Sequence, residues 1–376
     1  MQRIVLHVDL DSFYASLEEL RNKQIQGKPI VVCVFSGRTE DSGAVSTGNY
    51  RARELGIKAG MPIVFAKRLA KDKDVVFLPV DMDYYHAVSE RIMEILEEET
   101  DIIQQVSIDE AYLDITGRSS GDWDNAQRIS EEIKRRIRAE EGLTCSIGIG
   151  PNRLLAKMAS ERKKPDGLTI VKESQVNDFL RELPVSDLHG VGDKTVEVLN
   201  ELGIKTADGL ATFDLLILVG KFGKNRAKML QEKAQGIDDT PVEPREIQQI
   251  SRIATLKEDT SDLETILEKL RELSTDMKDR IEKKQVVFRT VSIITIDTDL
   301  KLHTRGKTIK PTDDVSLLLE TSRSLLEGFL EDNPGKKMRR VGMRVSNLAC
   351  RADSRNLEGL DRYLDQTLTR PDRSER

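Results

Sequence analysis

The chain has 376 residues, of which 33% are charged and 38% are hydrophobic, and its formal net charge is −6. This length predicts two or more domains with substantial cores. No apolar stretch approaches the roughly 20 residues of a membrane span, the N-terminus does not resemble a signal peptide, and the three cysteines have no metal-ligand spacing. We therefore expect a cytoplasmic monomer with reduced thiols and no membrane partner.

Strand and helix patterns alternate over about the first 170 residues. The continuous apolar run 29–35 predicts a buried strand, and Ser12 is positioned to cap the helix that follows it. The other strands are expected at 4–8, 104–115 (two strands) and 145–150, and the helices at 12–21, 50–55, 87–99, 125–140 and 152–162.

Two acidic clusters follow short apolar runs in this region. Asp9 and Asp11 form the first, and Asp109 and Glu110 form the second. Carboxylates at the ends of apolar strands are costly unless a cation neutralises them. If the two strands lie side by side, Asp9, Asp109 and Glu110 form the acidic site that two Mg²⁺ ions need for phosphoryl transfer. The alternative is that they are ordinary carboxylates of strand ends and turns.

Between and after these clusters lie donors that suit a triphosphate. Thr47, Tyr50 and Arg53 are three apart, so a helical turn and its lead-in would point them the same way. Arg53 can bind phosphate in a bidentate manner. Lys164 adds a cation in a turn after a predicted helix. Each residue taken alone is equally consistent with an ordinary surface position.

The segment from 185 to 236 is helical in composition and contains a helix-hairpin-helix pattern. Gly190, Gly192 and Lys194 would form a turn whose backbone N–H groups bind a DNA phosphate at a helix N-terminus. A weaker second copy is present at 219–227. Glycines at such positions are otherwise simple helix caps.

After a polar linker the pattern becomes that of a second mixed domain. The expected order is strand 250–256, helix 262–278, strand 286–297, a basic turn, helix 315–330 and strand 339–348, followed by a polar tail. Residues 245–351 hold 21 Lys and Arg against 18 Asp and Glu. The acidic average therefore argues only weakly against DNA binding.

Four ordered segments resemble the signature motifs of a known family. They are Val8–Ala15, Gly43–Tyr50, Ser107–Asp114 and Lys164–Gly167. Together they resemble the Y-family translesion DNA polymerases of the DinB-like branch, and the phrase Val32–Arg38 resembles the archaeal members of that branch. The resemblance extends over nearly the whole chain, to about residue 364.

This resemblance implies an α+β multidomain right-hand polymerase. The implied parts are a palm (1–12 and 80–170), small fingers (13–79), a helix-hairpin-helix thumb (171–238), a linker (239–249), a mixed α/β little finger (250–350) and a tail (351–376). The implied activity is template-directed DNA synthesis of low fidelity, with dNTPs on primer–template DNA, past damaged template bases and without proofreading.

The resemblance also assigns roles within the active site. It implies that Asp9, Asp109 and Glu110, with the Leu10 carbonyl, hold two Mg²⁺ ions. One ion would activate the primer 3′-hydroxyl and the other would hold the triphosphate. The nucleotide contacts would be Thr47, Tyr50, Arg53 and Lys164, and the acidic residue Asp11 is of secondary rank.

Further implied roles concern the sugar, the base pair and the DNA. Tyr14 resembles a steric gate that excludes a 2′-hydroxyl. Small residues would roof the nascent pair, and such a roof discriminates weakly by shape; they are Val34, Ala44, Ser46 and Gly60. Basic residues of the little finger would bind phosphates, Arg339 and Arg340 foremost, with Arg252, Lys257, Arg289, Arg305, Lys307, Lys310 and Arg344 as further candidates, about half of them only solvated.

The segment 357–364 has the apolar and aromatic spacing of a sliding-clamp-binding peptide. Two positions depart from that pattern, because Leu357 stands where Gln is expected and Leu364 occupies an aromatic place. The alternative is a short amphipathic turn. For the whole chain, the competing functions are a two-metal nuclease or nucleotidyl cyclase and a non-catalytic DNA-binding protein.

Overall fold

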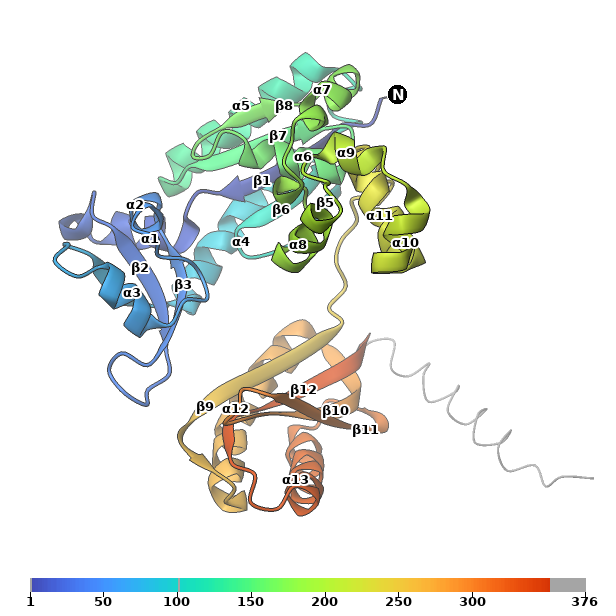
Figure 1. Cartoon of the computed structure of the whole chain (residues 1–376). Helices are drawn as coiled ribbons and strands as arrows, with labels where there is room; N and C mark the ends of the chain where they lie inside the picture. Colours follow the sequence, from blue (N-terminus) through green and yellow to red (C-terminus); the bar gives the residue numbers. More distant parts are fainter. Residues whose placement is uncertain (1, 101, 352–376) are drawn as a thin grey trace, which may run out of the picture. The chain divides into compact units, whose positions relative to one another are not determined.

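The computed structural model describes residues 2–100 and 102–351, and its chain divides into two units (Figure 1). Residues 1–34 and 44–245 form the first unit, whereas 35–43 and the chain from 246 onward form the second. Within the described residues, no helix is long and apolar enough to cross a membrane.

A five-stranded sheet lies at the centre of the first unit. Its order is β5 (Ile102–Gln105), β6 (Glu110–Asp114), β1 (Val5–Leu10), β7 (Cys145–Gly150) and β8 (Leu168–Ile170). The central strand β1 is antiparallel to both of its neighbours, and β8 is parallel to β7. The two acidic clusters are therefore on adjacent strands.

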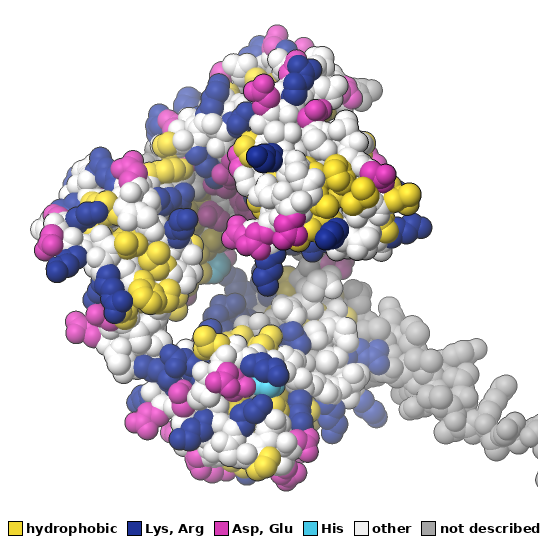
Figure 2. All heavy atoms as spheres, in the orientation of Figure 1, with side chains coloured by type: hydrophobic (Ala, Val, Ile, Leu, Met, Phe, Trp, Pro, Cys, Tyr) yellow, Lys and Arg dark blue, Asp and Glu magenta, His cyan; other side chains and the backbone are white. Residues whose placement is uncertain are grey.

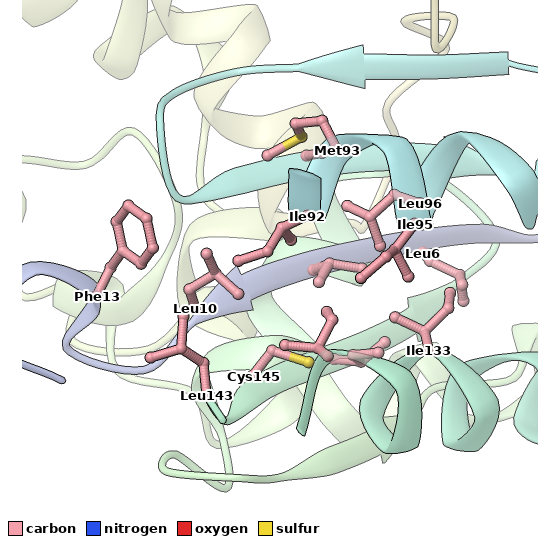
Figure 3. Close-up of a cluster of buried hydrophobic side chains, with 14 of the residues drawn as sticks. Leu6, Leu10, Phe13, Ile92, Met93, Ile95, Leu96, Ile133, Leu143 and Cys145 are labelled. Carbon is pink, nitrogen blue, oxygen red and sulfur yellow. The ribbon is translucent and has the colours of Figure 1, made fainter. Parts of the chain in front are cut away.

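Side-chain alternation along β1 gives the sheet two different faces. Leu6 and Leu10 are buried in a core with α4 (Met82–Glu98) and α5 (Trp123–Glu141) (Figure 3). The intervening residues His7 and Asp9 point to the opposite face, against which α6 (Arg153–Glu161) packs. The polar residues of β1 thus lie between the sheet and α6.

Two glycines of β7 let α6 approach the sheet very closely. A Cβ on Gly148 would lie 2.0 Å from the Ala156 carbonyl oxygen and 2.3 Å from the Ser160 nitrogen. At Gly150 the Ala156 nitrogen would be 2.7 Å away. Only residues without a side chain fit here, so the position of α6 is set by backbone contact.

A smaller sheet of the order β3 (Gly43–Gly48), β2 (Ile30–Phe35) and β4 (Val76–Pro79) precedes α4 in the chain. Strand β2 is buried on both faces at its start. Ile30 and Val32 pack in the first core, which includes α1 (Phe13–Arg21), and Val31 and Cys33 pack with α2 (Tyr50–Glu54) and α3 (Ile63–Leu69).

The first unit continues with short helices that share a separate core. They are α7 (Val176–Arg181), α8 (Asp193–Glu201), α9 (Ala207–Ala211), α10 (Leu215–Phe222) and α11 (Lys224–Ala234), with 3-10 turns at Glu173–Gln175 and Val185–Asp187. A further 3-10 turn, Lys23–Ile25, follows α1 and packs in the first core. The chain that follows runs along the five-stranded sheet. Arg3 donates to the Thr240 carbonyl at 2.9 Å, and Val242 is buried against Val5.

The second unit is a four-stranded antiparallel sheet with two helices on one face. The sheet order is β11 (Leu302–Thr312), β10 (Val286–Asp297), β12 (Met338–Cys350) and β9 (Gln249–Thr260). Helices α12 (Leu263–Lys284) and α13 (Val315–Asp332) cover the face that contributes Val291, Met343 and Val345 to the core.

Three expectations from the sequence were wrong. The buried strand 29–35 begins at Ile30, and its last two side chains, Val34 and Phe35, are 52% and 37% exposed. Ser12 is the N-cap residue of α1 but its side chain makes no capping bond, and its backbone is left-handed with a φ of 49°. The expected basic turn is largely the edge strand β11, whose lysines and arginines keep the edge polar.

Candidate active site at the end of the central strand

A cleft of about 410 Å³ opens where β1 ends beside the β5–β6 hairpin. It brings together residues from four segments of the chain, 9–14, 46–53, 107–109 and the turn that holds Lys164. Its lining includes Asp9, Leu10, Tyr14, Ser46, Thr47, Tyr50, Arg53, Asp109 and Lys164 from the predicted site, together with Ser12, Phe13, Ser107 and Ile108.

Strand pairing places the acidic residues around the mouth of this cleft. Asp9 is the register partner of Glu110, and the Leu10 N–H donates to the Asp109 carbonyl at 2.9 Å. The Asp109 carboxylate accepts a hydrogen bond from Ser107 Oγ at 2.5 Å. The two clusters are thus neighbours, as the sequence predicted.

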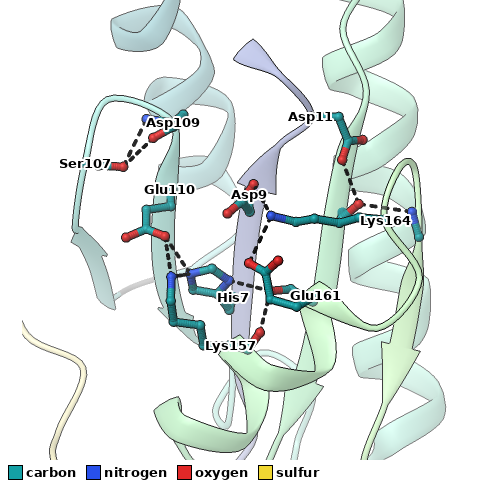
Figure 4. A network of polar contacts seen from close by, with 12 residues as sticks. His7, Asp9, Asp11, Ser107, Asp109, Glu110, Lys157, Glu161 and Lys164 are labelled. Carbon is teal, nitrogen blue, oxygen red and sulfur yellow. Dashed lines mark hydrogen bonds and ion pairs between the residues drawn. The ribbon is translucent and has the colours of Figure 1, made fainter. Parts of the chain in front are cut away.

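Two lysines from α6 and the turn after it neutralise these carboxylates (Figure 4). Lys164 Nζ lies 2.6 Å from Asp9 Oδ1, and Lys157 Nζ lies 2.5 Å from Glu110 Oε2. His7 Nε2 is 3.4 Å from the same oxygen of Glu110. Each acidic strand end therefore faces a cation.

The two carboxylates differ in proton affinity. Burial raises the pKa of Asp9 to about 6, although Lys164 opposes the shift and Glu161 and Asp109 add to it. The neighbouring His7 ring and the Lys157 ammonium hold the pKa of Glu110 at about 2, against the effect of burial. Asp9 thus retains an incompletely compensated negative charge inside the cleft.

The donor set fits a divalent cation. Asp9, Asp109 and the Leu10 carbonyl offer the hard oxygen ligands that Mg²⁺ binds. Within the part of the chain that the structure describes, no three His, Cys, Asp or Glu side chains already converge on one point. The Glu110 carboxylate does not join those of Asp9 and Asp109, because it is turned toward Lys157.

Asp11 is fully engaged in the structure around the cleft. Its carboxylate accepts bonds from Thr144 Oγ1, Ser146 Oγ and the Asp166 N–H, each at 2.8 Å, and from Tyr50 OH at 3.3 Å. These donors hold the 164–167 turn and α2 beside the end of β1. A structural role agrees with the secondary rank that the sequence suggested.

Tyr14 lies at the start of α1 and lines the cleft beside Asp109. Its ring stacks on Tyr85 with centroids 4.4 Å apart and an interplanar angle of 17°. Tyr85 is itself fully buried and donates to Glu18 Oε1 at 2.5 Å. Tyr85 of α4 therefore packs against the Tyr14 ring and restricts its movement.

The three phosphate-type donors come from a helical turn and its lead-in, as the sequence predicted, and the lead-in is a strand. Thr47 is on strand β3, whereas Tyr50 and Arg53 are on α2, which Asn49 caps by accepting from the Ala52 N–H. All three nevertheless line the cleft. The Arg53 guanidinium lies 5.0 Å from the Tyr50 ring centre, so the two side chains support each other.

Among the proposed roof residues only Ser46 lines the cleft. Ala44, two residues before Ser46 on β3, forms a β-bridge with Pro62. The Gly60 N–H donates to the Val45 carbonyl of the same strand at 2.9 Å. Val34 lies at the exposed end of β2, the neighbour of β3. The roof candidates therefore lie on β3, on its neighbour β2 and in the segment that bonds to β3, and the structure brings only Ser46 into the cleft.

The helix-hairpin-helix glycines form the predicted turn. Gly190 has a φ of 90°, which only glycine adopts readily, and Gly192 is the N-cap of α8. Lys194 is exposed in the first turn of that helix. Gly223, with a φ of 79°, joins α10 and α11 in the second copy.

The basic residues of the second unit are divided between the two faces of its sheet. Arg340 and Arg344 alternate with the core residues of β12 and so project from the face without helices, and Arg339 lies at a register shift. Arg252 pairs with Asp276 of α12, and Arg305 pairs with Asp332 of α13. Figure 2 shows lysines and arginines on the visible surface of the second unit.

The proposed clamp-binding segment 357–364 lies outside the described residues.

Sequence reasoning did not identify His7, Lys157 and Tyr85 as parts of the site. A signal for Lys157 was present, because Lys157, Glu161 and Lys164 recur at intervals of four and three. The alternation that predicted β1 likewise placed His7 on the face of Asp9. Neither pattern predicts which residue the Lys157 or His7 side chain contacts.

Three family models match the chain. The impB/mucB/samB family matches residues 8–161, its C-terminal domain matches 247–359, and the helix-hairpin-helix motif of the same family matches 173–204. Curated relatives include the DNA polymerase IV of Methanosarcina acetivorans, 46% identical over 93% of this chain and 96% of its own length. The DNA polymerase IV of Nitrosopumilus maritimus is 44% identical over 92% of this chain and 96% of its own length.

Solved structures give the same result. A Y-family DNA polymerase chimera of Dbh and Dpo4 has a TM-score of 0.85, with 36% identity over 92% of this chain and 99% of its own. An insertion ternary complex of the Dbh DNA polymerase has a TM-score of 0.71, with 35% identity over 92% and 99%. Both support the right-hand α+β fold expected from the sequence, including its thumb motif and its C-terminal sheet domain.

The raised pKa of Asp9 predicts that Asp9→Asn stabilises the metal-free protein at pH 7. The folded state binds the Asp9 proton more tightly than the unfolded state, so stability falls as the pH rises from about 4 to about 6. The rise of the Asp9 pKa from 3.8 to about 6 corresponds to roughly 3 kcal/mol, a net effect in which the Lys164 pair is already included. Chemical unfolding of the first unit at pH 4.5 and 7 measures this.

The matched control is Asp239→Asn, which changes an exposed carboxylate of the same unit. It should leave the pH dependence of stability as in the wild type. If the free energy of unfolding of Asp9→Asn depends on pH as it does in the wild type, Asp9 is not the group responsible for that dependence.

Proposed function

Because the chain belongs to the impB/mucB/samB family of Y-family, DinB-like DNA polymerases, we propose that Asp9, Asp109, Glu110 and the Leu10 carbonyl hold two Mg²⁺ ions for nucleotidyl transfer. The protein is a DNA-directed DNA polymerase of translesion synthesis. One observation carries the site assignment: two carboxylates, the Tyr14 ring and four phosphate-type donors line a single cleft.

Bound Mg²⁺ would supply Lewis acidity at the primer 3′-hydroxyl and charge neutralisation at the triphosphate. The protein's part is to hold the reactants. Arg53 and Lys164 would bind phosphate oxygens through charge-assisted bonds, and the hydroxyls of Thr47 and Tyr50 would fix the triphosphate's orientation. Lys164 is already in the cleft, held 2.6 Å from Asp9, and would exchange that partner for a phosphate.

We propose that Tyr14 is the steric gate and that Val34, Ala44, Ser46 and Gly60 roof the nascent base pair. The stacking on Tyr85 supports the gate, since a ring that cannot retreat excludes a 2′-hydroxyl by contact. The roof candidates are small or half exposed and would press weakly on a misshapen pair. Low fidelity and lesion tolerance follow from that weak contact.

For the rest of the chain we propose the domain boundaries inferred from the sequence. Gly190, Gly192 and Lys194 of the thumb would bind a DNA phosphate, and Arg339 and Arg340 of the little finger would add salt-sensitive contacts. The segment 357–364 would bind a sliding clamp. The protein would act as a cytoplasmic monomer.

The proposal is tested by primer extension. Asp109→Asn should lower extension with Mg²⁺ and dNTPs by roughly a thousandfold, because a lost metal ligand removes several kcal/mol of transition-state stabilisation. Asp114→Asn is the matched control, since this carboxylate is at the far end of β6, the strand that begins directly after Asp109, and lies outside the cleft. Full activity of Asp109→Asn, or none in the wild type, would contradict the proposal.

This assay also separates the competing functions. A two-metal nuclease would shorten the labelled primer, a nucleotidyl cyclase would release cyclic nucleotide without using the primer, and a non-catalytic DNA-binding protein would leave it unchanged. Extension that follows the template sequence is expected of a polymerase alone.

Tyr14→Ala should keep dNTP incorporation but lower the discrimination against ribonucleotides by at least about tenfold, because the clash with the 2′-hydroxyl is removed. Single-nucleotide incorporation with matched dNTP and rNTP gives the ratio. Tyr14→Phe keeps the ring and should discriminate like the wild type. Equal discrimination in the alanine variant would exclude Tyr14 as the gate.

Removal of residues 353–376 should abolish stimulation of synthesis by the sliding clamp while basal extension persists. Extension on a primed circular template, with and without the clamp, measures this. Leu360→Ala with Tyr363→Ala is the sharper variant, since it changes only the proposed anchors. Stimulation equal to that of the full chain would place clamp binding elsewhere.

A further inference from the structure

Lys164, a proposed contact for the triphosphate, lies in a turn and not on a helix or strand. Helix α6 ends at Glu161, and β8 begins at Leu168. The Lys164 side chain is nevertheless only 16% exposed, and its ammonium meets Asp9 in the cleft (Figure 4). A cation on a loose turn would lose more entropy on binding a phosphate than a cation on a fixed one. The contacts that fix this turn therefore bear on nucleotide binding.

Asp166 fixes the turn through both its backbone and its side chain. Its N–H donates to Asp11 Oδ2 at 2.8 Å, beside the cleft. Its carboxylate pairs with α5, with Oδ1 2.7 Å from Lys134 Nζ and Oδ2 in contact with Arg138. Although burial opposes the shift, these two cations hold the pKa of Asp166 below its ordinary value. The side chain is therefore a carboxylate at neutral pH and attracts α5.

Lys134 binds the backbone around the turn as well as Asp166. Its Nζ lies 2.5 Å from the Cys145 carbonyl oxygen and 3.3 Å from that of Gly167. With Asp166, each of the three donors of the ammonium has an acceptor. Cys145 begins β7 and is the register partner of Leu10 at the end of β1. One cation thus joins the turn to the strand that pairs with the acidic end of β1.

Lys134 is the more buried of the two cations at Asp166. Its side chain is 18% exposed, whereas that of Arg138 is 59% exposed. An ion pair at the exposed surface contributes little because water screens it. Loss of a partly buried donor costs more, because its acceptors then lack a partner. We therefore expect Lys134 to hold the turn more strongly than Arg138 does.

This anchor lies outside the active-site cleft. The described residues that line the cleft include neither Lys134 nor Asp166. Both instead line a separate hollow of about 580 Å³, formed by α5 and the start of β8 and lined also by Arg138 and Leu168. A nucleotide in the cleft would not touch them. Any effect that they have on nucleotide binding therefore passes through the turn.

We propose that Lys134 and Asp166 are positioning residues for Lys164, which hold the 164–167 turn from the side of α5 and thereby set the affinity for the triphosphate of the incoming nucleotide. This inference rests on the proposed nucleotide contact of Lys164. When Lys164 exchanges Asp9 for a phosphate, its side chain moves while the turn stays fixed. Loss of the Lys134 ammonium lets the turn move and weakens the phosphate contact.

The test measures dNTP binding to the full chain by isothermal titration calorimetry, with Mg²⁺ and a primer–template whose dideoxy end prevents reaction. Lys134→Met should weaken dNTP binding by about tenfold, because a small displacement of a positioned group has effects of this order. Its affinity for the primer–template should equal that of the wild type. Arg135→Met is the matched control and should bind dNTP normally, because Arg135 lines the same hollow but pairs with Glu132 of its own helix.

A double-mutant cycle separates positioning from a general effect on the fold. In the Lys164→Ala background, Lys134→Met should weaken dNTP binding by less than about twofold, because the contact through which it acts is already lost. Two effects that multiply would show that Lys134 does not act through Lys164. If Lys164→Ala binds dNTP like the wild type, the proposed nucleotide contact itself is wrong. Loss of binding there with an unaffected Lys134→Met rejects only the positioning role.

Two substitutions of Asp166 provide an independent test. Its φ of 55° is accessible to both asparagine and glycine. Asp166→Asn keeps an acceptor for Lys134 and should retain most of the dNTP affinity, whereas Asp166→Gly lacks one and should lose about as much as Lys134→Met. Should Lys134→Met fail to fold, this pair of variants decides. Wild-type dNTP affinity in Lys134→Met, or equal affinity in the two Asp166 variants, would overturn the inference.

Discussion

The pairing of carboxylates on two adjacent strands with ammonium groups from α6 is the interaction on which the site depends. Asp9 and Glu110 are register partners, and without counter-ions their burial would be strongly unfavourable. Lys164 and Lys157 compensate these charges. The compensation is unequal, as the raised pKa of Asp9 and the lowered pKa of Glu110 indicate. The site is thus stable in the absence of metal and still attracts cations.

Helix α6 connects this charge arrangement to the rest of the first unit. One side of the helix rests on β7 through Gly148 and Gly150. The other side contributes Leu154, Leu155 and Met158 to the core of α7–α11. A displacement of α6 would therefore move its lysines and disturb two cores at once. Backbone contact on one side and packed side chains on the other keep the cations in register with the acids.

The remaining groups of the cleft are held by contacts that leave their reactive ends accessible. Tyr14 is backed by Tyr85, Arg53 supports Tyr50, and Ser107 fixes Asp109. A site in which side chains are held before the substrate arrives loses less entropy on binding. In the proposed function, this rigidity would control the sugar through Tyr14, and the small roof candidates would control the base pair only loosely.

The sequence by itself determined the acidic clusters, the strands that carry them and the helices with clear periodicity, because alternation of two and 3.6 residues reflects local burial. It also predicted the neighbours Asp9 and Asp109 correctly. Only the tertiary structure decided that Thr47 is on a strand, that 302–312 is an edge strand, and that His7, Lys157 and Tyr85 belong to the site. The first two features depend on the pairing of β3 with β2 and of β11 with β10. The third depends on contacts between residues more than 60 positions apart in the chain, such as that of His7 with Lys157, separated by 150 positions. No local pattern encodes such a partner.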